Sequence, residues 1–147
     1  MSATFIERLQ QMPLFGGLTE SALRVLLSHA QEVTRPASGL FFSEGERGDA
    51  LYVLNSGEVE LTKDAENDPM VLTRLKPGDC FGEMSIIDFS PRSATARAVV
   101  ESQALEVSMD GLLALYQSDV EQFAMIHMNM ARELSRRLRQ LGDRLRG

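Results

Sequence analysis

The spacing of hydrophobic residues changes its period twice along the chain. From about residue 3 to residue 30, apolar side chains recur at helical spacing. Leu23, Leu26 and Leu27, for example, would share one face of a helix that Thr19 would cap at its N-terminus. A proline and a glycine follow shortly afterwards and end this pattern. The first part of the chain is therefore predicted to form short helices.

Between about residues 37 and 108 the pattern is that of short β-strands. Runs rich in β-branched and aromatic residues are separated by Gly, Asn, Asp or Pro. Two of these runs flank Asn55-Ser56-Gly57, which has the composition of a tight turn. Many short strands at spacings of roughly 8–12 residues are typical of sandwiches and barrels. The segment Glu83–Asp88 differs and is expected to form a short helical insert.

The helical period returns after Asp110, first as a short helix and then as one long helix from Asp119 to about Leu145. The predicted fold class is α+β. It consists of a small antiparallel β-barrel of jelly-roll type, flanked by N-terminal helices (about 3–30) and by C-terminal helices (about 110–145). All of these elements belong to a single expected domain, 1–147.

Charge and composition exclude several classes of function. The net charge of −6 argues against direct binding of nucleic acid, which depends on Lys and Arg to neutralise phosphates. A membrane span needs a run of about 18 or more apolar residues, and the chain contains none. The N-terminus also lacks the pattern of a signal peptide. The one cysteine, Cys80, cannot form an internal disulfide, so a cytoplasmic location is expected.

The most informative stretch is 81–98, which sets an acid and an arginine around a mostly apolar, small-residue run. Gly82 lets the backbone approach a ligand closely, because it has no Cβ atom. Arg92 carries a fork of donors that matches phosphate or carboxylate, and an ionised Glu83 can accept hydrogen bonds from hydroxyl groups. A ligand with an anionic group and a hydroxyl would satisfy both. Alternatively, Glu83 and Arg92 pair with each other and tie the insert to the barrel.

This stretch resembles the phosphate-binding cassette of the cyclic nucleotide-binding domain family, the regulatory module of protein kinase A, cyclic nucleotide-gated channels and the catabolite activator protein. The cassette is usually Phe-Gly-Glu, a short apolar helix and Arg-(Ser/Thr/Ala)-Ala-(Thr/Ser). Here it is complete, as Phe81-Gly82-Glu83-Met84 through Pro91-Arg92-Ser93-Ala94-Thr95. The resemblance covers nearly the whole chain and includes the upstream residues Gly45, Gly48, Leu51-Tyr52-Val53-Leu54, Gly57 and Pro77-Gly78-Asp79.

The resemblance implies a role for each cassette residue. Glu83 would accept a hydrogen bond from the ribose 2′-hydroxyl, and Arg92 would pair with the cyclic phosphate. The ligand-binding residues predicted in this way are Gly82, Glu83, Met84, Arg92, Ser93 and Ala94 in the cassette, with Leu61, Leu72 and Thr73 against the base. The C-terminal helix would cap the base through Arg136, Arg137 or Leu138. The ligand would be cAMP or cGMP, and Ser93 favours cAMP.

Three functions remain open at this stage. The first is a regulatory module that binds a cyclic nucleotide and signals through movement of the C-terminal helix to an effector protein. The second is a structural or interaction protein whose cassette no longer binds nucleotide in a functional way. The third is an enzyme on the same barrel, which is disfavoured because the sequence has no catalytic constellation and no metal-ligand cluster. Neither a metal nor another cofactor is expected.

The long C-terminal helix also carries two seven-residue repeats. Such repeats define a coiled-coil register. One consists of Ala124, Ala131, Leu138 and Leu145, and the other of Val120, His127, Leu134 and Leu141. The helix could form a homodimer along these residues or pack on the barrel of its own chain, and the sequence favours neither.

Overall fold

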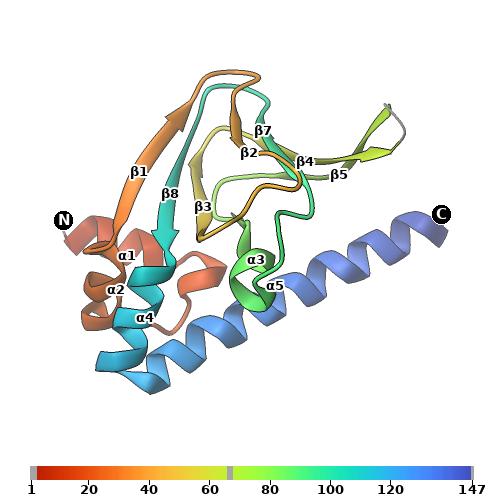
Figure 1. Ribbon diagram of the computed structural model, residues 1–147. Helices are drawn as coiled ribbons and strands as arrows, with labels where there is room; N and C mark the ends of the chain where they lie inside the picture. Colours follow the sequence, from red (N-terminus) through yellow and green to blue (C-terminus); the bar gives the residue numbers. More distant parts are fainter. Residues whose placement is uncertain (1–2, 66–67, 147) are drawn as a thin grey trace.

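The computed structural model describes residues 3–65 and 68–146, which form two four-stranded antiparallel sheets with helices beside and beneath them (Figure 1). The N-terminal elements are α1 (Ala3–Gln10), the 3-10 turn η1 (Pro13–Phe15) and α2 (Glu20–Leu27). The strands are β1 (Ala30–Arg35), β2 (Leu40–Phe42), β3 (Ala50–Ser56), β4 (Val59–Ala65), β5 (Asp68–Leu75), β6 (Cys80–Phe81), β7 (Thr95–Ala98) and β8 (Ser102–Ser108). The remaining helices are α3 (Glu83–Asp88), α4 (Met109–Ser118) and α5 (Val120–Arg146).

One sheet has the strand order β1-β8-β3-β6 and the other has the order β2-β7-β4-β5. The predicted α+β class, with a jelly-roll-like pair of sheets and a long C-terminal helix, is confirmed. The helical insert lies at the predicted Glu83–Asp88, and the side chain of Thr19 caps α2 by accepting from the backbone N–H of Ala22.

The boundary between the N-terminal helices and the first strand was predicted wrongly. The sequence indicated helix to about residue 30 and a barrel from about residue 37, whereas α2 ends at Leu27 and β1 begins at Ala30. β1 pairs antiparallel with β8, from Ala30 opposite Val107 to Arg35 opposite Ser102. Its side chains are exposed or half-buried throughout, so its sequence lacks the alternation that identifies a strand. The distant partner strand, rather than a local pattern, determines this element.

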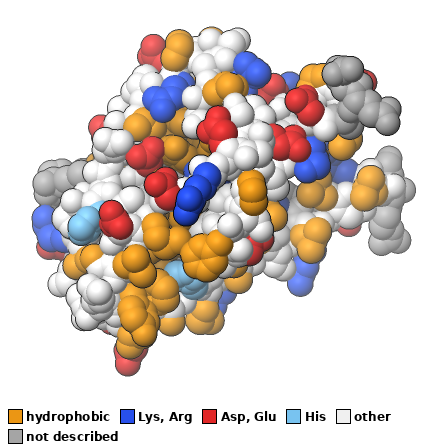
Figure 2. All heavy atoms as spheres, in the orientation of Figure 1, with side chains coloured by type: hydrophobic (Ala, Val, Ile, Leu, Met, Phe, Trp, Pro, Cys, Tyr) orange, Lys and Arg blue, Asp and Glu red, His pale blue; other side chains and the backbone are white. Residues whose placement is uncertain are grey.

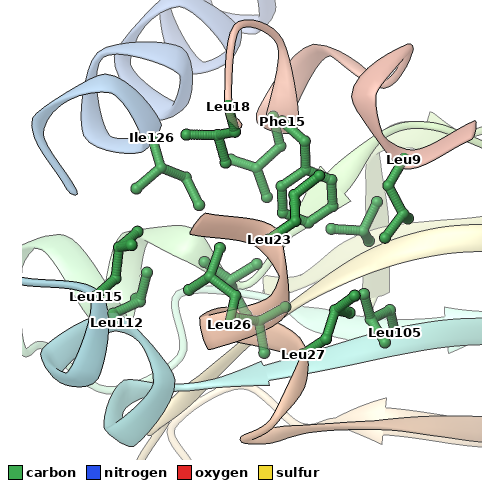
Figure 3. Packing of buried hydrophobic residues seen from close by; sticks show 14 of the residues in the cluster. Leu9, Phe15, Leu18, Leu23, Leu26, Leu27, Leu105, Leu112, Leu115 and Ile126 are labelled. Atoms are coloured by element: carbon green, nitrogen blue, oxygen red, sulfur yellow. The ribbon is translucent and has the colours of Figure 1, made fainter. Parts of the chain in front are cut away.

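Two hydrophobic clusters form the core. The first joins the N-terminal helices to β8, α4 and the beginning of α5, and Figure 3 shows Phe15, Leu23, Leu115 and Ile126 converging from four of these elements. The second lies between the two sheets and is rich in aromatic rings, namely Phe41, Phe42, Tyr52 and Phe81. This aromatic cluster directly underlies the cassette, since β6 leads into α3 through Gly82.

Helix α5 is anchored at one end and crosses the barrel with the other (Figure 1). Ile126 and Met130 are fully buried in the first core cluster. Between them, the Asn129 amide donates hydrogen bonds of 2.9 Å to the backbone carbonyls of Leu14 and Gly16. No helix in the part of the chain that the structure describes is both long and apolar enough to span a bilayer.

Candidate ligand-binding site

A cavity of about 410 Å³ lies between the β2-β7-β4-β5 sheet, the cassette and α5. This volume falls within the range of roughly 300–1,000 Å³ that is typical of small-molecule sites. The barrel contributes Phe42, Leu61, Leu72 and Thr73, the cassette contributes Gly82, Glu83, Met84, Ser85, Arg92, Ser93 and Ala94, and α5 contributes Leu134, Arg137, Leu138, Gln140, Leu141 and Arg144. The lining is mostly apolar, with a few polar groups at defined positions.

The structure brings together all nine residues that the sequence assigned to ligand binding, because each of them lines this cavity. Of the three predicted cap residues, Arg137 and Leu138 also line it. Arg136 does not: its guanidinium donates to Glu133 at 2.8 Å and lies 3.7 Å from a carboxylate oxygen of Asp79. Adjacent residues of a helix point in directions about 100° apart, so only part of the predicted trio can face the cavity.

The sequence prediction missed Phe42, Ser85 and four residues of α5. Those four are Leu134, Gln140, Leu141 and Arg144. Leu134, Leu141 and Arg144 stand three, four and seven positions from Arg137, which is the spacing of one helix face. Once Arg137 is placed at the cavity, the helical period would have found them. Leu134 and Leu141 also belong to the second seven-residue repeat, and for these two residues the structure contains the alternative in which they pack on the chain's own barrel.

The guanidinium of Arg92 is buried beneath the cassette. Its Nη1 donates to the Gly82 carbonyl at 2.8 Å, and its Nη2 donates to the Ala50 carbonyl at 2.7 Å. The ring of Phe42 lies 4.2 Å from its Cζ atom, a cation–π contact. Burial lowers the pKa of Arg92 from its ordinary value. An arginine has five N–H donors, and the buried Nε of this one has no partner among the described residues, so donor capacity remains for a ligand.

Two glycines make room for this arginine. A Cβ atom on Gly48 would lie 2.4 Å from Cζ of Arg92, and one on Gly82 would lie 2.7 Å from its Nη1. Gly82 also has φ +82°, a left-handed conformation that L side chains rarely adopt. The cassette glycine and the upstream glycine therefore serve the same purpose, which is to let the backbone approach the guanidinium.

Backbone hydrogen bonds hold the cassette arginine in place. The Arg92 N–H donates to the Glu46 carbonyl at 2.7 Å, and its carbonyl accepts from the Gly45 N–H at 2.8 Å. Next to it, Lys63 donates to the Ser93 carbonyl at 3.1 Å. The Ser93 hydroxyl lies 3.8 Å from the sulfur of Met84. The segment from Arg92 onward is thus tied to the barrel by its main chain, which leaves its side chains available to the cavity.

Glu83 is paired, but not with Arg92. Its Oε1 accepts a hydrogen bond of 3.0 Å from Nη1 of Arg137, which also donates through Nη2 to the Cys80 carbonyl. The side chain is only 2% exposed, and its buried Oε2 has no partner in the described part of the chain. Burial raises the pKa of Glu83, and the Arg137 guanidinium acts against that rise. The alternative that Glu83 and Arg92 pair with each other is not what the structure contains.

Metal binding finds no support at this site. Among the described residues, no three His, Cys, Asp or Glu side chains are grouped so that they could hold a metal ion. Burial raises the pKa of the nearby Cys80 thiol to about 12, so the thiol stays protonated and packs as a small apolar side chain.

The sequence and the fold are similar to those of known proteins. Residues 33–119 match the family model for the cyclic nucleotide-binding domain, and this match covers more than half of the chain. The chain therefore belongs to the cyclic nucleotide-binding domain family.

Its relatives are regulatory proteins. It is 34% identical over 140 residues to a CRP-like cAMP-activated global transcriptional regulator of Mycobacterium tuberculosis, an alignment that covers 95% of this chain and 61% of the regulator. The structure of a cyclic nucleotide-binding domain from Methylobacillus flagellatus superposes with a TM-score of 0.83 at 28% identity, covering 95% of this chain and 79% of that one. The regulatory domain of Toxoplasma gondii PKA with cAMP superposes with a TM-score of 0.71 at 30% identity, covering 78% and 46%. The chain thus spans about three-fifths of the bacterial regulator that it matches.

Proposed function

We propose that the chain is a regulatory module that binds a cyclic nucleotide in this cavity. The observation that carries the proposal is a set of unsatisfied polar groups on one apolar cavity. Among the described residues, these are the Nε donors of Arg92 and Arg137 and the Oε2 acceptor of Glu83. Buried polar atoms are almost always hydrogen-bonded in proteins, so an orphaned donor and an orphaned acceptor together indicate a ligand with both functions. A cyclic nucleotide offers an anionic phosphate to the arginine, a ribose hydroxyl to the glutamate and a flat base to the leucines.

The module is proposed to prefer cAMP to cGMP. Ser93 follows the cassette arginine, and the mycobacterial relative is named as cAMP-activated. We also propose that the protein has no enzymatic activity of its own, requires no metal or other cofactor, binds no nucleic acid directly and acts in the cytoplasm. The similarity to a regulatory domain of PKA favours a binding module over an enzyme, the net charge of −6 argues against binding of nucleic acid, and the single cysteine fits a reducing compartment.

Titration with cAMP and with cGMP tests the function directly. A ligand present at about 100 times its Kd should add roughly 2.7 kcal/mol to the free energy of unfolding, because it binds only the folded state. The measurements are isothermal calorimetry and thermal unfolding, with 5′-AMP and adenosine as controls that lack the cyclic phosphodiester. Saturable binding of cAMP that exceeds that of both controls is expected. If neither cyclic nucleotide binds, the chain is better explained as an interaction protein with an inactive cassette.

The proposed output is a movement of α5 that an effector protein or a second copy of the chain would detect. One face of α5 carries apolar and small residues in alternating three- and four-residue steps, and its Leu138 also borders the cavity. These residues are Ala124, Met128, Ala131, Ser135, Leu138, Gly142 and Leu145. All seven are exposed, and none is charged, although arginines flank them on the same helix. Figure 2 shows isolated hydrophobic side chains along this projecting end of α5, on the right of the picture. An uncharged seam of this spacing is typical of paired helices, which favours a homodimer through α5.

Replacing Ala131 by glutamate should shift such a dimer to monomers, because it places a charge where two helices would meet closely. The variant Arg139→Glu introduces the same side chain on the same helix beside the seam and serves as the control. Sedimentation equilibrium over a range of concentrations measures the effect. We expect Ala131→Glu to raise the dimer dissociation constant by at least about tenfold, since burying an unpaired charge costs several kcal/mol. A wild type that stays monomeric would leave the effector protein as the proposed partner.

A further inference from the structure

Met84 places an oxidisable sulfur at the ligand cavity. The residue lies in the first turn of α3, directly after Glu83, and is 47% exposed. It lines the cavity, and its sulfur lies 3.8 Å from the hydroxyl oxygen of Ser93. A methionine that solvent can reach is open to oxidation to the sulfoxide, which is polar where the thioether was apolar. The chemical state of this one sulfur therefore affects the polarity of the ligand site.

The other described methionines are placed differently. Met70 on β5 and Met128 on α5 are about as exposed as Met84, at 54% and 55%, but neither of them lines the cavity. The remaining ones belong to the first core cluster or pack against it: Met12, Met109, Met125 and Met130. Among the residues that the structure describes, Met84 is thus the methionine that combines access to solvent with a place at the ligand site.

Oxidation of Met84 would change the partner of the neighbouring hydroxyl. The thioether sulfur is a weak acceptor, so the Ser93 hydroxyl is only loosely held at 3.8 Å and can turn to a ligand. A sulfoxide adds a polar oxygen to the same sulfur and so offers this hydroxyl a stronger acceptor. The backbone of Ser93 is poorly placed to shift away, because its carbonyl accepts from Lys63 and the preceding Arg92 is bonded through its N–H and its carbonyl.

We propose that Met84 is a site of reversible oxidation by peroxides, and that its sulfoxide lowers the affinity for cyclic nucleotide by accepting the hydrogen bond of the Ser93 hydroxyl. In the reaction the thioether sulfur attacks one oxygen of hydrogen peroxide, so that an S–O bond forms and the O–O bond breaks. The hydroxide that leaves takes the proton of the transferred hydroxyl and becomes water. The sulfur loses two electrons, and the peroxide gains them. This inference goes beyond the proposed function and rests on it.

Peroxide treatment followed by titration tests the proposal. Purified wild type is incubated with hydrogen peroxide, peptide mass spectrometry measures the sulfoxide at each methionine, and calorimetry gives the affinity for cAMP before and after. The affinity should fall at least about tenfold once Met84 is oxidised, because a hydrogen bond to a charged phosphate is worth about that factor. Reduction by methionine sulfoxide reductase with a thiol should restore it. Bound cAMP should also slow the oxidation of Met84 but not that of Met70, which lies outside the cavity.

Two variants locate the effect at Met84. Met84→Leu keeps an apolar side chain of similar size without a sulfur, so peroxide should not change its affinity from that of its own untreated sample. Met70→Leu/Met128→Leu retains Met84 and lacks the other two exposed sulfurs, so peroxide should weaken its binding by the same factor as in wild type. Weakened binding in treated Met84→Leu, or undiminished binding in the treated double variant, would assign the effect to another residue and overturn the proposal.

Ser93→Ala tests the mechanism, again by comparison with its own untreated sample. This variant has no hydroxyl for the sulfoxide to hold, so oxidation should reduce its affinity by a smaller factor than in wild type. Equal factors would refute the role of the hydroxyl. Circular dichroism of the oxidised wild type should show a folded protein, and unfolding would also overturn the proposal. An untreated wild type that binds neither cyclic nucleotide refutes the proposed function, whereas one that binds cAMP equally well with Met84 oxidised refutes only the present inference.

Discussion

Replacing Arg92 by leucine should lower the affinity for cAMP or cGMP by roughly 30- to several-thousand-fold, or about 2–5 kcal/mol. The substitution removes the charged donor that would meet the cyclic phosphate. It also leaves the carbonyls of Gly82 and Ala50 without their present donor, so the cassette itself should loosen. Calorimetric titration of both proteins with each nucleotide measures the effect.

The loss of binding must be separated from loss of folding. Two unpaired buried carbonyls cost about 1–3 kcal/mol each, so the free energy of unfolding of Arg92→Leu should be measured alongside the titration. Arg97→Leu is the matched control, because Arg97 lies on β7, is exposed and also donates to a backbone carbonyl, that of Ser38. A folded Arg92→Leu protein with the affinity of wild type would refute the assigned role of Arg92.

Replacing Phe81 by alanine should reduce the free energy of unfolding by about 3–5 kcal/mol, the usual effect of truncating a fully buried phenylalanine. The ring is inaccessible to solvent and stacks on Tyr52 at a centroid distance of 5.2 Å. It also meets Phe41 edge-on at 5.3 Å. Its removal would leave a void between the sheets, directly before the cassette glycine.

The same segment provides a matched control for this substitution. Phe89 follows α3 and is 80% exposed, so Phe89→Ala should change the free energy of unfolding by no more than about 0.5 kcal/mol. Urea denaturation followed by circular dichroism compares both variants with wild type. Similar losses in the two variants would mean that the aromatic cluster does not carry the stability assigned to it here.

The sequence predicted the cassette well because its determinants are local. Gly82, the short apolar helix and the small residues after Arg92 lie within one stretch, and each has a direct physical meaning. The bounds of α3 followed from this pattern, as did the predicted cavity residues of the cassette. Leu61, Leu72 and Thr73 were predicted from the family resemblance instead. β1 was missed for the opposite reason, because its pairing with β8 depends on residues far along the chain.

The partner of Glu83 could not be predicted from local pattern either. Arg137 follows it by 54 positions and reaches it only because α5 crosses the barrel in one particular rotation. A different rotation of the helix would have presented Arg136, which instead pairs with Glu133. The anchoring of α5 by Asn129 sets this rotation, and no pattern in the sequence indicates which loop carbonyls its amide will bind.

Because α5 is one continuous helix, a tilt of the helix moves its far end more than its middle. The helix contains no proline, and it would tilt about Asn129, where the amide and the neighbouring core residues hold it. Arg137 sits about 12 Å beyond that point and Leu145 about 24 Å beyond it, at 1.5 Å per residue. A tilt that moves Arg137 by about 2 Å, enough to break its bond to Glu83, would move Leu145 by about 4 Å. A displacement at the cassette would thus be doubled where the exposed end of the helix could meet a partner.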